Sequence, residues 1–442
     1  MHISRIKDFH VVQSLLREEV VAMLLYLKLN NYTIYNQEVE FSMMANMHYS
    51  RFPSNVASVD GVHALKTAVL LGPNNTGKTN FVRAIAMMKA IMLNLSPSIV
   101  PNIFSGSAIV KASISFLESG KEYVLDIKYD AEHGEYVYER FVEVHRDKYK
   151  NVRTHVLLLR DIQAKEFIAD DESLVSVMKV AARNNLLIYL LDTESFPTLR
   201  KIREAVIAFA SKIDIVDMNN IPIKKTIDML KLTGEDSQRI AKFVLNADLS
   251  LDDFRYAGDD EVRIVFQGVN TEKSSPQENA LQQAAPLTEM LHLVSVYQGV
   301  PVPSILFDST GTKKMAALAS YVIGALKAGR ILVVDELDNS LHFRLTRAII
   351  SLFNNELNED AQLIVTVHDI SLLDCNSLFR KEQIWFTHKD KERAYLYSLS
   401  DFTASESKTR GTSDLVAKYR AGVFGALPEP DLFDTLLEVS QS

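Results

Sequence analysis

The stretch Gly72-Pro73-Asn74-Asn75-Thr76-Gly77-Lys78-Thr79 fits the pattern G-x-x-x-x-G-K-[ST]. Its glycines let the backbone curl so that successive N–H groups point inward at phosphate oxygens. Lys78 would add a point charge for the β- and γ-phosphates, and the Thr79 hydroxyl would ligate Mg²⁺. An apolar run at 64–71 predicts a buried strand before the loop, and a helix is expected from Asn80 to residue 93. Gly72 to Asn80 are therefore the predicted cofactor-binding residues, with ATP and Mg²⁺ as the cofactors.

A second stretch, Ile331-Leu332-Val333-Val334-Asp335-Glu336, is an apolar run that ends in two carboxylates. A strand this apolar is buried on both faces, and its end lies at the edge of a parallel sheet where ligands bind. Asp335 is expected to hold Mg²⁺, and Glu336 to act as the general base on the attacking water. Strands often end in acids, so this motif is informative mainly in combination with the phosphate loop.

The stretch Asp308-Ser309-Thr310-Gly311-Thr312 precedes an apolar helical run. Exposed N–H groups at a helix start make a second anion site, although helix capping by Ser309 or Thr310 is the simpler alternative. The phosphates of one nucleotide would already be bound by the loop Gly72–Thr79 of the same chain. Ser309 and Gly311 therefore fit a dimer in which they cap the nucleotide held by a partner subunit.

His368 follows the apolar stretch 362–367, which is expected to form the strand after that of Asp335. A lone histidine is more often structural than functional. At the end of this strand, however, it can reach a γ-phosphate and report whether that phosphate is present. Lys78, Glu336 and His368 are the predicted catalytic residues.

In the remaining sequence the spacing of apolar residues changes several times between that of strands and that of helices. Alternation of apolar and polar residues from 110 to 129 predicts an antiparallel meander, and apolar spacing from 197 to 213 predicts a helix. Shorter helices are expected at 224–232 and 236–245, a strand at 262–266 and an exposed loop at 267–283. From residue 304 onward strands (304–307, 330–334, 361–367) and helices (315–328, 343–354) alternate, which argues for a parallel sheet.

These patterns predict four regions: an N-terminal extension (1–23), an N-terminal lobe (24–164), a helical insertion (165–250) and a C-terminal lobe (251–442). The composition is that of a folded protein, with 47% hydrophobic residues and a net charge of -8, so a globally basic nucleic-acid coat is excluded. The longest clean apolar runs, such as 20–27, are far shorter than the roughly 20 residues of a membrane span. The single cysteine, Cys375, points to a reducing compartment, and a cytoplasmic location without membrane contact is expected.

The order of these motifs resembles the ATP-binding-cassette (ABC) class of P-loop ATPases. Within that class the chain resembles the AAA-type ATPases grouped with RecF, SMC and OLD proteins, and especially those of bacterial phage-defence and abortive-infection operons, including the PARIS system. Three further stretches share the resemblance: 335–342, 380–386 and 419–428. The matching motifs are the Walker A loop (Gly72–Thr79), the Walker B strand (Ile331–Glu336), the signature loop (Ser309–Thr312), the D-loop (Asn339–His342) and the switch histidine (His368).

The chain also departs from the ABC pattern. Its signature loop is not LSGGQ, because Thr310 replaces the first glycine and Thr312 the glutamine. His342 stands where transporter D-loops carry aspartate. A Q-loop glutamine is not placed: the segment around Asn102, where one would be expected, contains none.

The resemblance implies an α/β fold of the P-loop NTPase, ABC type, with a mixed or parallel central sheet, an antiparallel β-meander and a helical insertion. It implies an ATPase that forms homodimers, or higher oligomers built from ATP-sandwich dimers. The expected role is that of a sensor or regulator in anti-phage defence. Only 74 residues follow His368, so its effector, such as a TOPRIM or other nuclease, is expected to be encoded separately.

Two other functions remain open at this point. One is a RecF- or SMC-like repair ATPase that acts directly on DNA, although 165–250 is too short for coiled-coil arms. The other is a nucleotide-gated scaffold without catalysis. Both Lys78 and Glu336 are present, so hydrolysis is chemically feasible.

Overall fold

The computed structural model describes residues 21–146, 152–232, 234–247, 250–269, 289–391, 393–402, 415–425 and 427. The predicted extension at 1–23 lies outside these residues except for its last three positions. The predicted loop at 267–283 also lies largely outside them.

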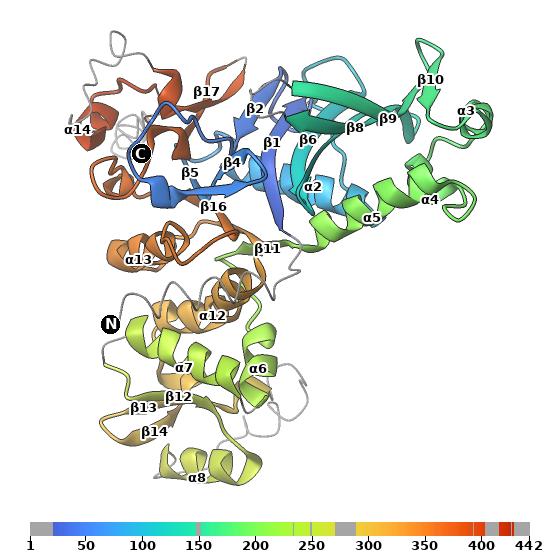
Figure 1. Ribbon diagram of the computed structural model, residues 1–442. Helices are drawn as coiled ribbons and strands as arrows, with labels where there is room; N and C mark the ends of the chain where they lie inside the picture. Colours follow the sequence, from blue (N-terminus) through green and yellow to red (C-terminus); the bar gives the residue numbers. More distant parts are fainter. Residues whose placement is uncertain are drawn as a thin grey trace, which may run out of the picture.

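The N-terminal lobe is built on an antiparallel seven-stranded sheet, which confirms the predicted meander (Figure 1). Its alternating sequence turns one face toward a large apolar core. In spatial order the strands are β10 (Glu166–Ala169), β9 (Val152–Asp161), β8 (Glu135–Arg146), β7 (Lys121–Asp130), β6 (Ile109–Glu118), β1 (Ala22–Asn30) and β2 (Val39–Ser42). A separate hairpin pairs β3 (Val56–Val59) with β4 (Val62–Leu65).

A second, six-stranded sheet forms the centre of the molecule. Its strands pair in parallel except for the last pair, β17–β18, so the carboxyl ends of the parallel strands meet at one edge. Strands β5, β15 and β16 are buried along their whole length, as continuous apolar runs predict. The order is β11 (Ile213–Asp217), β15 (Ile331–Asp335), β16 (Gln362–Val367), β5 (Thr67–Leu71), β17 (Ile384–Lys389) and β18 (Ala394–Ser398).

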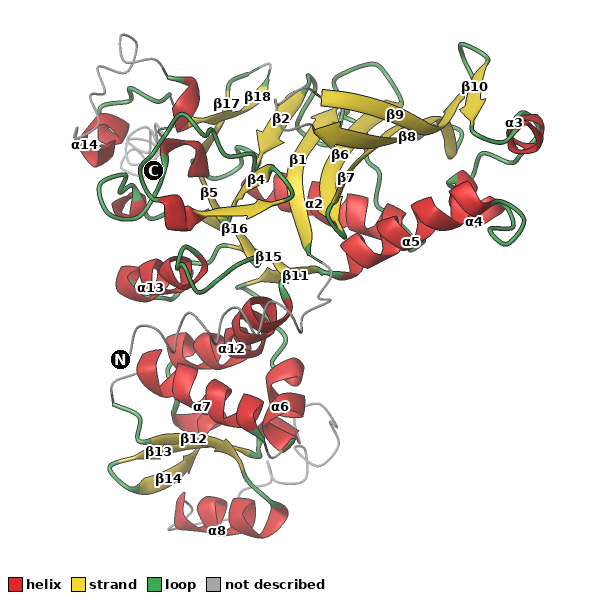
Figure 2. Cartoon of the chain, viewed as in Figure 1, coloured by secondary structure: helices red, strands yellow, loops and turns green. Residues whose placement is uncertain are grey.

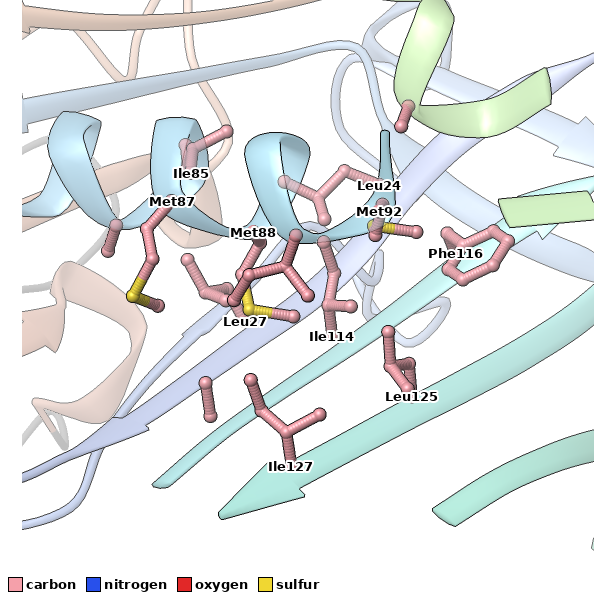
Figure 3. Close-up of a cluster of buried hydrophobic side chains, with 14 of the residues drawn as sticks. Leu24, Leu27, Ile85, Met87, Met88, Met92, Ile114, Phe116, Leu125 and Ile127 are labelled. Atoms are coloured by element: carbon pink, nitrogen blue, oxygen red, sulfur yellow. The ribbon is translucent and has the colours of Figure 1, made fainter. Parts of the chain in front are cut away.

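The apolar core between the two sheets is filled by α2 (Lys78–Met92) and α5 (Pro197–Ser211). Figure 3 shows methionine and isoleucine side chains of α2 against inward-facing residues of β1, β6 and β7. The short helices α3 (Glu172–Met178) and α4 (Leu187–Leu190) continue this layer. The helix that leaves the phosphate loop is thereby fixed by packing on the antiparallel sheet.

The opposite face of the central sheet is covered by α12 (Thr310–Ala328), α13 (Phe343–Phe353) and α14 (Leu415–Arg420). A third core lies where α12 meets α6 (Lys224–Lys231) and α7 (Glu235–Ala247). This part projects from the central sheet in Figure 2 and includes a small sheet of β12 (Asp253–Tyr256), β13 (Leu293–Tyr297) and β14 (Val300–Pro303). Among the described helices, none is long and apolar enough to cross a membrane.

Two predicted strands are wrong. Residues 262–266 lie inside a helix, α8 (Asp259–Val269), whose first turn carries three acidic residues that favour a helix N-terminus. Residues 304–307 form a single helical turn, α11 (Ser304–Phe307). Short apolar runs do not distinguish strand from helix, and both errors have that origin.

The region 165–250 also contains strands that the sequence interpretation did not include. β10 extends the antiparallel sheet, and β11 pairs in parallel with β15 in the central sheet. The predicted strand at 64–71 is divided in two, with β4 in the hairpin and β5 in the central sheet. These differences place a further strand end, that of β11, beside the one that carries Asp335.

Candidate functional site

The phosphate loop joins β5 to α2, as predicted, and Lys78 is the first residue of the helix. Its side chain folds back over the loop, and Nζ donates to the carbonyl oxygens of Gly72 (2.6 Å) and Pro73 (3.0 Å). Burial lowers the pKa of Lys78, and the negative charge of Asp335 partly offsets this effect. An ammonium held by carbonyl groups in a buried site is ready to bind an anion.

The loop is shaped by close packing on both sides. A Cβ at Gly72 would lie 2.3 Å from Thr387 Oγ1, and one at Gly77, where φ is +120°, would lie 2.7 Å from the Tyr35 hydroxyl. That hydroxyl donates to the Gly77 carbonyl at 3.0 Å. Thr76 Oγ1 bonds to Thr387 Oγ1 at 2.7 Å. These contacts hold the loop in the curled conformation that would bind phosphates.

The remaining loop residues face outward or lie in the first turn of α2. Asn74 and Asn75 are exposed, and Asn75 has φ +61°. Thr79 and Asn80 are half-buried. All predicted phosphate-loop residues thus belong to one strand–loop–helix unit.

Asp335 ends β15 at the same sheet edge, and a threonine of the neighbouring strand fixes it. Thr366 Oγ1 donates to Asp335 Oδ1 at 2.5 Å and accepts from the backbone N–H of Glu336 at 2.8 Å. Asp335 is buried, and its charge acts on Lys78 across the site. A buried carboxylate beside the phosphate loop is a donor that Mg²⁺ prefers, so Asp335 and the Thr79 hydroxyl fit this ion.

Glu336 has a left-handed backbone, with φ +55°, which turns its side chain out of the strand direction. Two amides hold its carboxylate: Asn219 Nδ2 lies 3.0 Å and Asn339 Nδ2 3.3 Å from Oε2. The other oxygen, Oε1, lies 3.9 Å from His368 Nε2. The predicted general base is thus fixed by side chains from three different segments.

His368 lies between Lys78 of the phosphate loop and Glu336 after β15. Its Nδ1 lies 3.5 Å from Lys78 Nζ, while its Nε2 faces Glu336. Asp338 anchors the histidine because its Oδ2 accepts the backbone N–H groups of His368 and Asp369, each at 2.7 Å. The structure therefore brings Lys78, Asp335, Glu336 and His368 together at one edge.

Ser309 and Gly311 lie elsewhere. Ser309 is the exposed N-cap of α12, and its Oγ accepts from the Thr312 backbone N–H at 3.1 Å, so the capping alternative is present. Gly311 packs on the D-loop, where a Cβ would lie 2.8 Å from the Ser340 carbonyl oxygen. Lys314 Nζ also contacts Ser340 Oγ at 3.3 Å. Neither Ser309 nor Gly311 is among the residues that line the cavity at the phosphate loop.

Several residues at the site were missed by the sequence interpretation. Thr366 and Thr387 are single hydroxyls on buried strands, which no motif marks. Asn219 follows β11, whose five residues Ile213–Asp217 include two aspartates, so no continuous apolar run marks this strand. The segment 419–427 also faces the phosphate loop, and its resemblance to the phage-defence ATPases was its only signal.

A family model described as "AAA domain, putative AbiEii toxin, Type IV TA system" matches residues 68–374, which is more than half of the 442 residues. The chain belongs to this family. Its described residues form a mixed α/β P-loop fold, and the family description names an AAA domain.

Solved structures that resemble this one over 85% of the chain are SMC head domains. They are the SmcHead bound to the C-winged helix domain of ScpA (TM-score 0.45, 14% identity, 97% of that chain covered), the SMC head domain from Thermotoga maritima (0.40, 11%, 98%), and the Smc head domain with an extended coiled coil bound to the C-terminal domain of ScpA derived from Pyrococcus furiosus (0.40, 12%, 96%). No curated protein matches the sequence.

Proposed function

We propose that the chain binds and hydrolyses ATP, that two copies clasp the nucleotide between them, and that it acts as a cytoplasmic sensor or regulator in bacterial anti-phage defence. In this role it would control a separate effector protein, such as a nuclease. The family description supports the abortive-infection part of the proposal. The geometry of the phosphate loop and the two acids supports the chemistry.

One observation carries the dimer proposal. Lys78, Glu336 and His368 converge, whereas Ser309 is the exposed N-cap of α12 and the half-buried Gly311 packs on the D-loop. A helix N-terminus at the surface, here capped by the exposed Ser309, is suited to an anion that another molecule brings. A second copy of the chain holds such an anion at its own Lys78.

The chain's own residues suggest how hydrolysis would proceed. Lys78 would exchange its carbonyl partners for phosphate oxygens, and Glu336 would accept a proton from the attacking water. His368, between these two groups, would contact the γ-phosphate. Mg²⁺, held by Thr79 and Asp335, would supply positive charge beside the phosphates.

Two variants test the proposal. We expect Lys78→Ala to lose nucleotide binding, and Glu336→Gln to bind ATP, hydrolyse it about 10²–10⁴-fold more slowly and accumulate as a dimer. ATPase rates and native mass with and without ATP measure both effects. Hydrolysis by Glu336→Gln at the parental rate would refute the general-base role, and an unaltered mass with ATP would refute the sandwich.

The role in defence needs a separate test. Co-purification with the product of a neighbouring gene and loss of phage protection in the Lys78→Ala variant are expected. Direct action on DNA remains the alternative, and it predicts salt-dependent DNA binding that stimulates ATP hydrolysis.

A further inference from the structure

A cavity of about 1040 Å³ opens beside the phosphate loop, on the side of β17. Its lining extends from His368 across the phosphate loop to parts of the chain that the proposed mechanism does not use. These include the turn after β17 and the segment that follows α14, and the lining residues that matter here are Pro73, His388, Lys389, Tyr419, Gly422 and Leu427. Sites for small molecules in proteins commonly have about 300–1,000 Å³.

The order of strands in the central sheet sets the direction of a bound triphosphate. Glu336 and His368 follow β15 and β16, which lie on one side of β5. The γ-phosphate belongs on that side because the general base must reach its attacking water. The ribose and base, at the opposite end of the nucleotide, must then lie on the other side of β5, next to β17.

The cavity on that side has a firm wall. Phe424 is buried and stacks on Phe386 of β17, with ring centroids 5.1 Å apart and an interplanar angle of 12°. The Tyr397 hydroxyl of β18 donates to the Phe424 carbonyl. These contacts fix the turn at 421–425 against the central sheet, so the C-terminal segment is part of the site's framework.

The lining also has the chemistry of a nucleoside site. Pro73 and Leu427 are apolar, while His388 and Tyr419 offer aromatic rings. On the outer side, the ring of His388 already stacks on that of Tyr395, at 6.0 Å and 23°. Aromatic and apolar surfaces of this kind bind the faces of a base.

We propose that this cavity holds the ribose and base of the bound nucleotide, with His388 and Lys389 of β17 on one wall and Tyr419, Gly422 and Leu427 on the other. The proposal rests on the proposed ATP site, whose phosphates it shares. It gives the C-terminal segment a role in nucleotide recognition, since two of its residues would contact the nucleoside directly.

The test compares ATP with inorganic tripolyphosphate, which has the phosphates but no nucleoside. By calorimetry, we expect His388→Ala to weaken ATP binding about 5- to 100-fold and to leave tripolyphosphate binding unchanged. Leu427→Trp, which narrows the cavity, should also weaken ATP binding and leave tripolyphosphate binding unchanged. Lys391→Ala is the matched control, because Lys391 is exposed in the same turn and does not line the cavity.

The outcomes separate the two proposals. If both cavity variants retain parental ATP affinity, or lose ATP and tripolyphosphate equally while melting at the parental temperature, the nucleoside site is refuted and the phosphate site stands. If the parental protein binds neither compound, the proposed ATPase function itself fails. Lys78→Ala should bind neither ATP nor tripolyphosphate, because both ligands depend on contacts to their phosphates.

Discussion

At the scale of single residues, Thr366 holds both acids of the candidate site. One hydroxyl donates to Asp335 and accepts from the backbone of Glu336, and the residue is fully buried. Neither acid has an equivalent contact from its own strand. The position of Asp335 and the left-handed backbone of Glu336 therefore depend on a side chain of β16.

We expect Thr366→Val, which keeps the shape and removes the hydroxyl, to lower the ATPase rate about 10- to 100-fold, because a hydrogen bond to a charged group contributes about 1.5–3 kcal/mol. Thr366→Ser keeps the hydroxyl and should retain most activity. Steady-state rates and melting temperatures of both variants separate this effect from misfolding. Equal rates for Thr366→Val and the parental protein would contradict the positioning role.

Glu118, at the end of β6, makes stability depend on pH. Its side chain is buried, and burial raises the pKa to about 7, despite a hydrogen bond from Ser119. The folded state thus binds a proton more tightly than the unfolded state, whose pKa is near 4.5. The stability gained from this group is present below pH 4.5 and is lost as the pH rises through 7.

Glu118→Gln removes this titration. We expect the variant to melt above the parental protein at pH 8 and close to it at pH 4.5. Glu204→Gln, at an exposed position of α5, is the control and should show no such pH dependence relative to the parent. Parallel melting curves of Glu118→Gln and the parent at all pH values would contradict the raised pKa.

At the scale of elements, Gln362 joins the two main sheets. Its Oε1 accepts the backbone N–H of Leu24 at 2.7 Å, and its Nε2 donates to the carbonyls of Leu24 (3.1 Å) and Leu65 (2.9 Å). The pairing register of β1 with β6 shifts between Leu24 and Tyr26. The buried amide therefore satisfies backbone groups next to an irregular part of β1.

Gln362→Ala would leave three buried backbone groups without these partners. We expect a loss of at least about 2–3 kcal/mol of unfolding free energy, since each such group costs about 1–3 kcal/mol. Urea unfolding measures it. Gln238→Ala, on the exposed face of α7, should change stability by less than about 0.5 kcal/mol. If Gln362→Ala lowered the unfolding free energy as little as Gln238→Ala does, the bridging role of Gln362 would be refuted.

The elements also show what sequence can predict. Strands β5, β15 and β16 were recognisable because each contains a continuous apolar run, and the meander because it alternates. β11 was not recognised: two of its residues are aspartates, and the half-buried Asp214 pairs with Arg330 and Lys225. That pairing is a tertiary contact, which no local pattern contains.

The candidate site divides in the same way. The phosphate loop is one short motif and the two acids are another, so each can be read from local sequence, the acids in combination with the loop. Asn219, Thr366, Tyr419 and Leu427 reach the site from distant parts of the chain. Each is an ordinary residue in its local context, and only the tertiary fold brings it to the candidate site.

At the scale of the whole molecule, the separation of Ser309 from the phosphate loop predicts complementation between defective chains. Lys78→Ala and Ser309→Arg should each be inactive alone, because a homodimer of either lacks a complete site. Mixing them should restore hydrolysis, since a mixed dimer has one intact Lys78 opposite one intact Ser309. Each variant alone, at the same total protein concentration, should stay inactive. If the mixture hydrolyses ATP no faster than either variant alone, the shared site is contradicted.

The contact between the first glycine of the phosphate loop and Thr387 has an evolutionary consequence. A Cβ at Gly72 would meet the backbone carbonyl oxygen of Thr387 at 2.4 Å as well as its side chain, so no exchange at 387 could make room for it. Selection on this glycine thus has two independent sources, phosphate chemistry and the neighbouring strand. Degenerate relatives that have lost the lysine and no longer use nucleotide should therefore still carry glycine at this position.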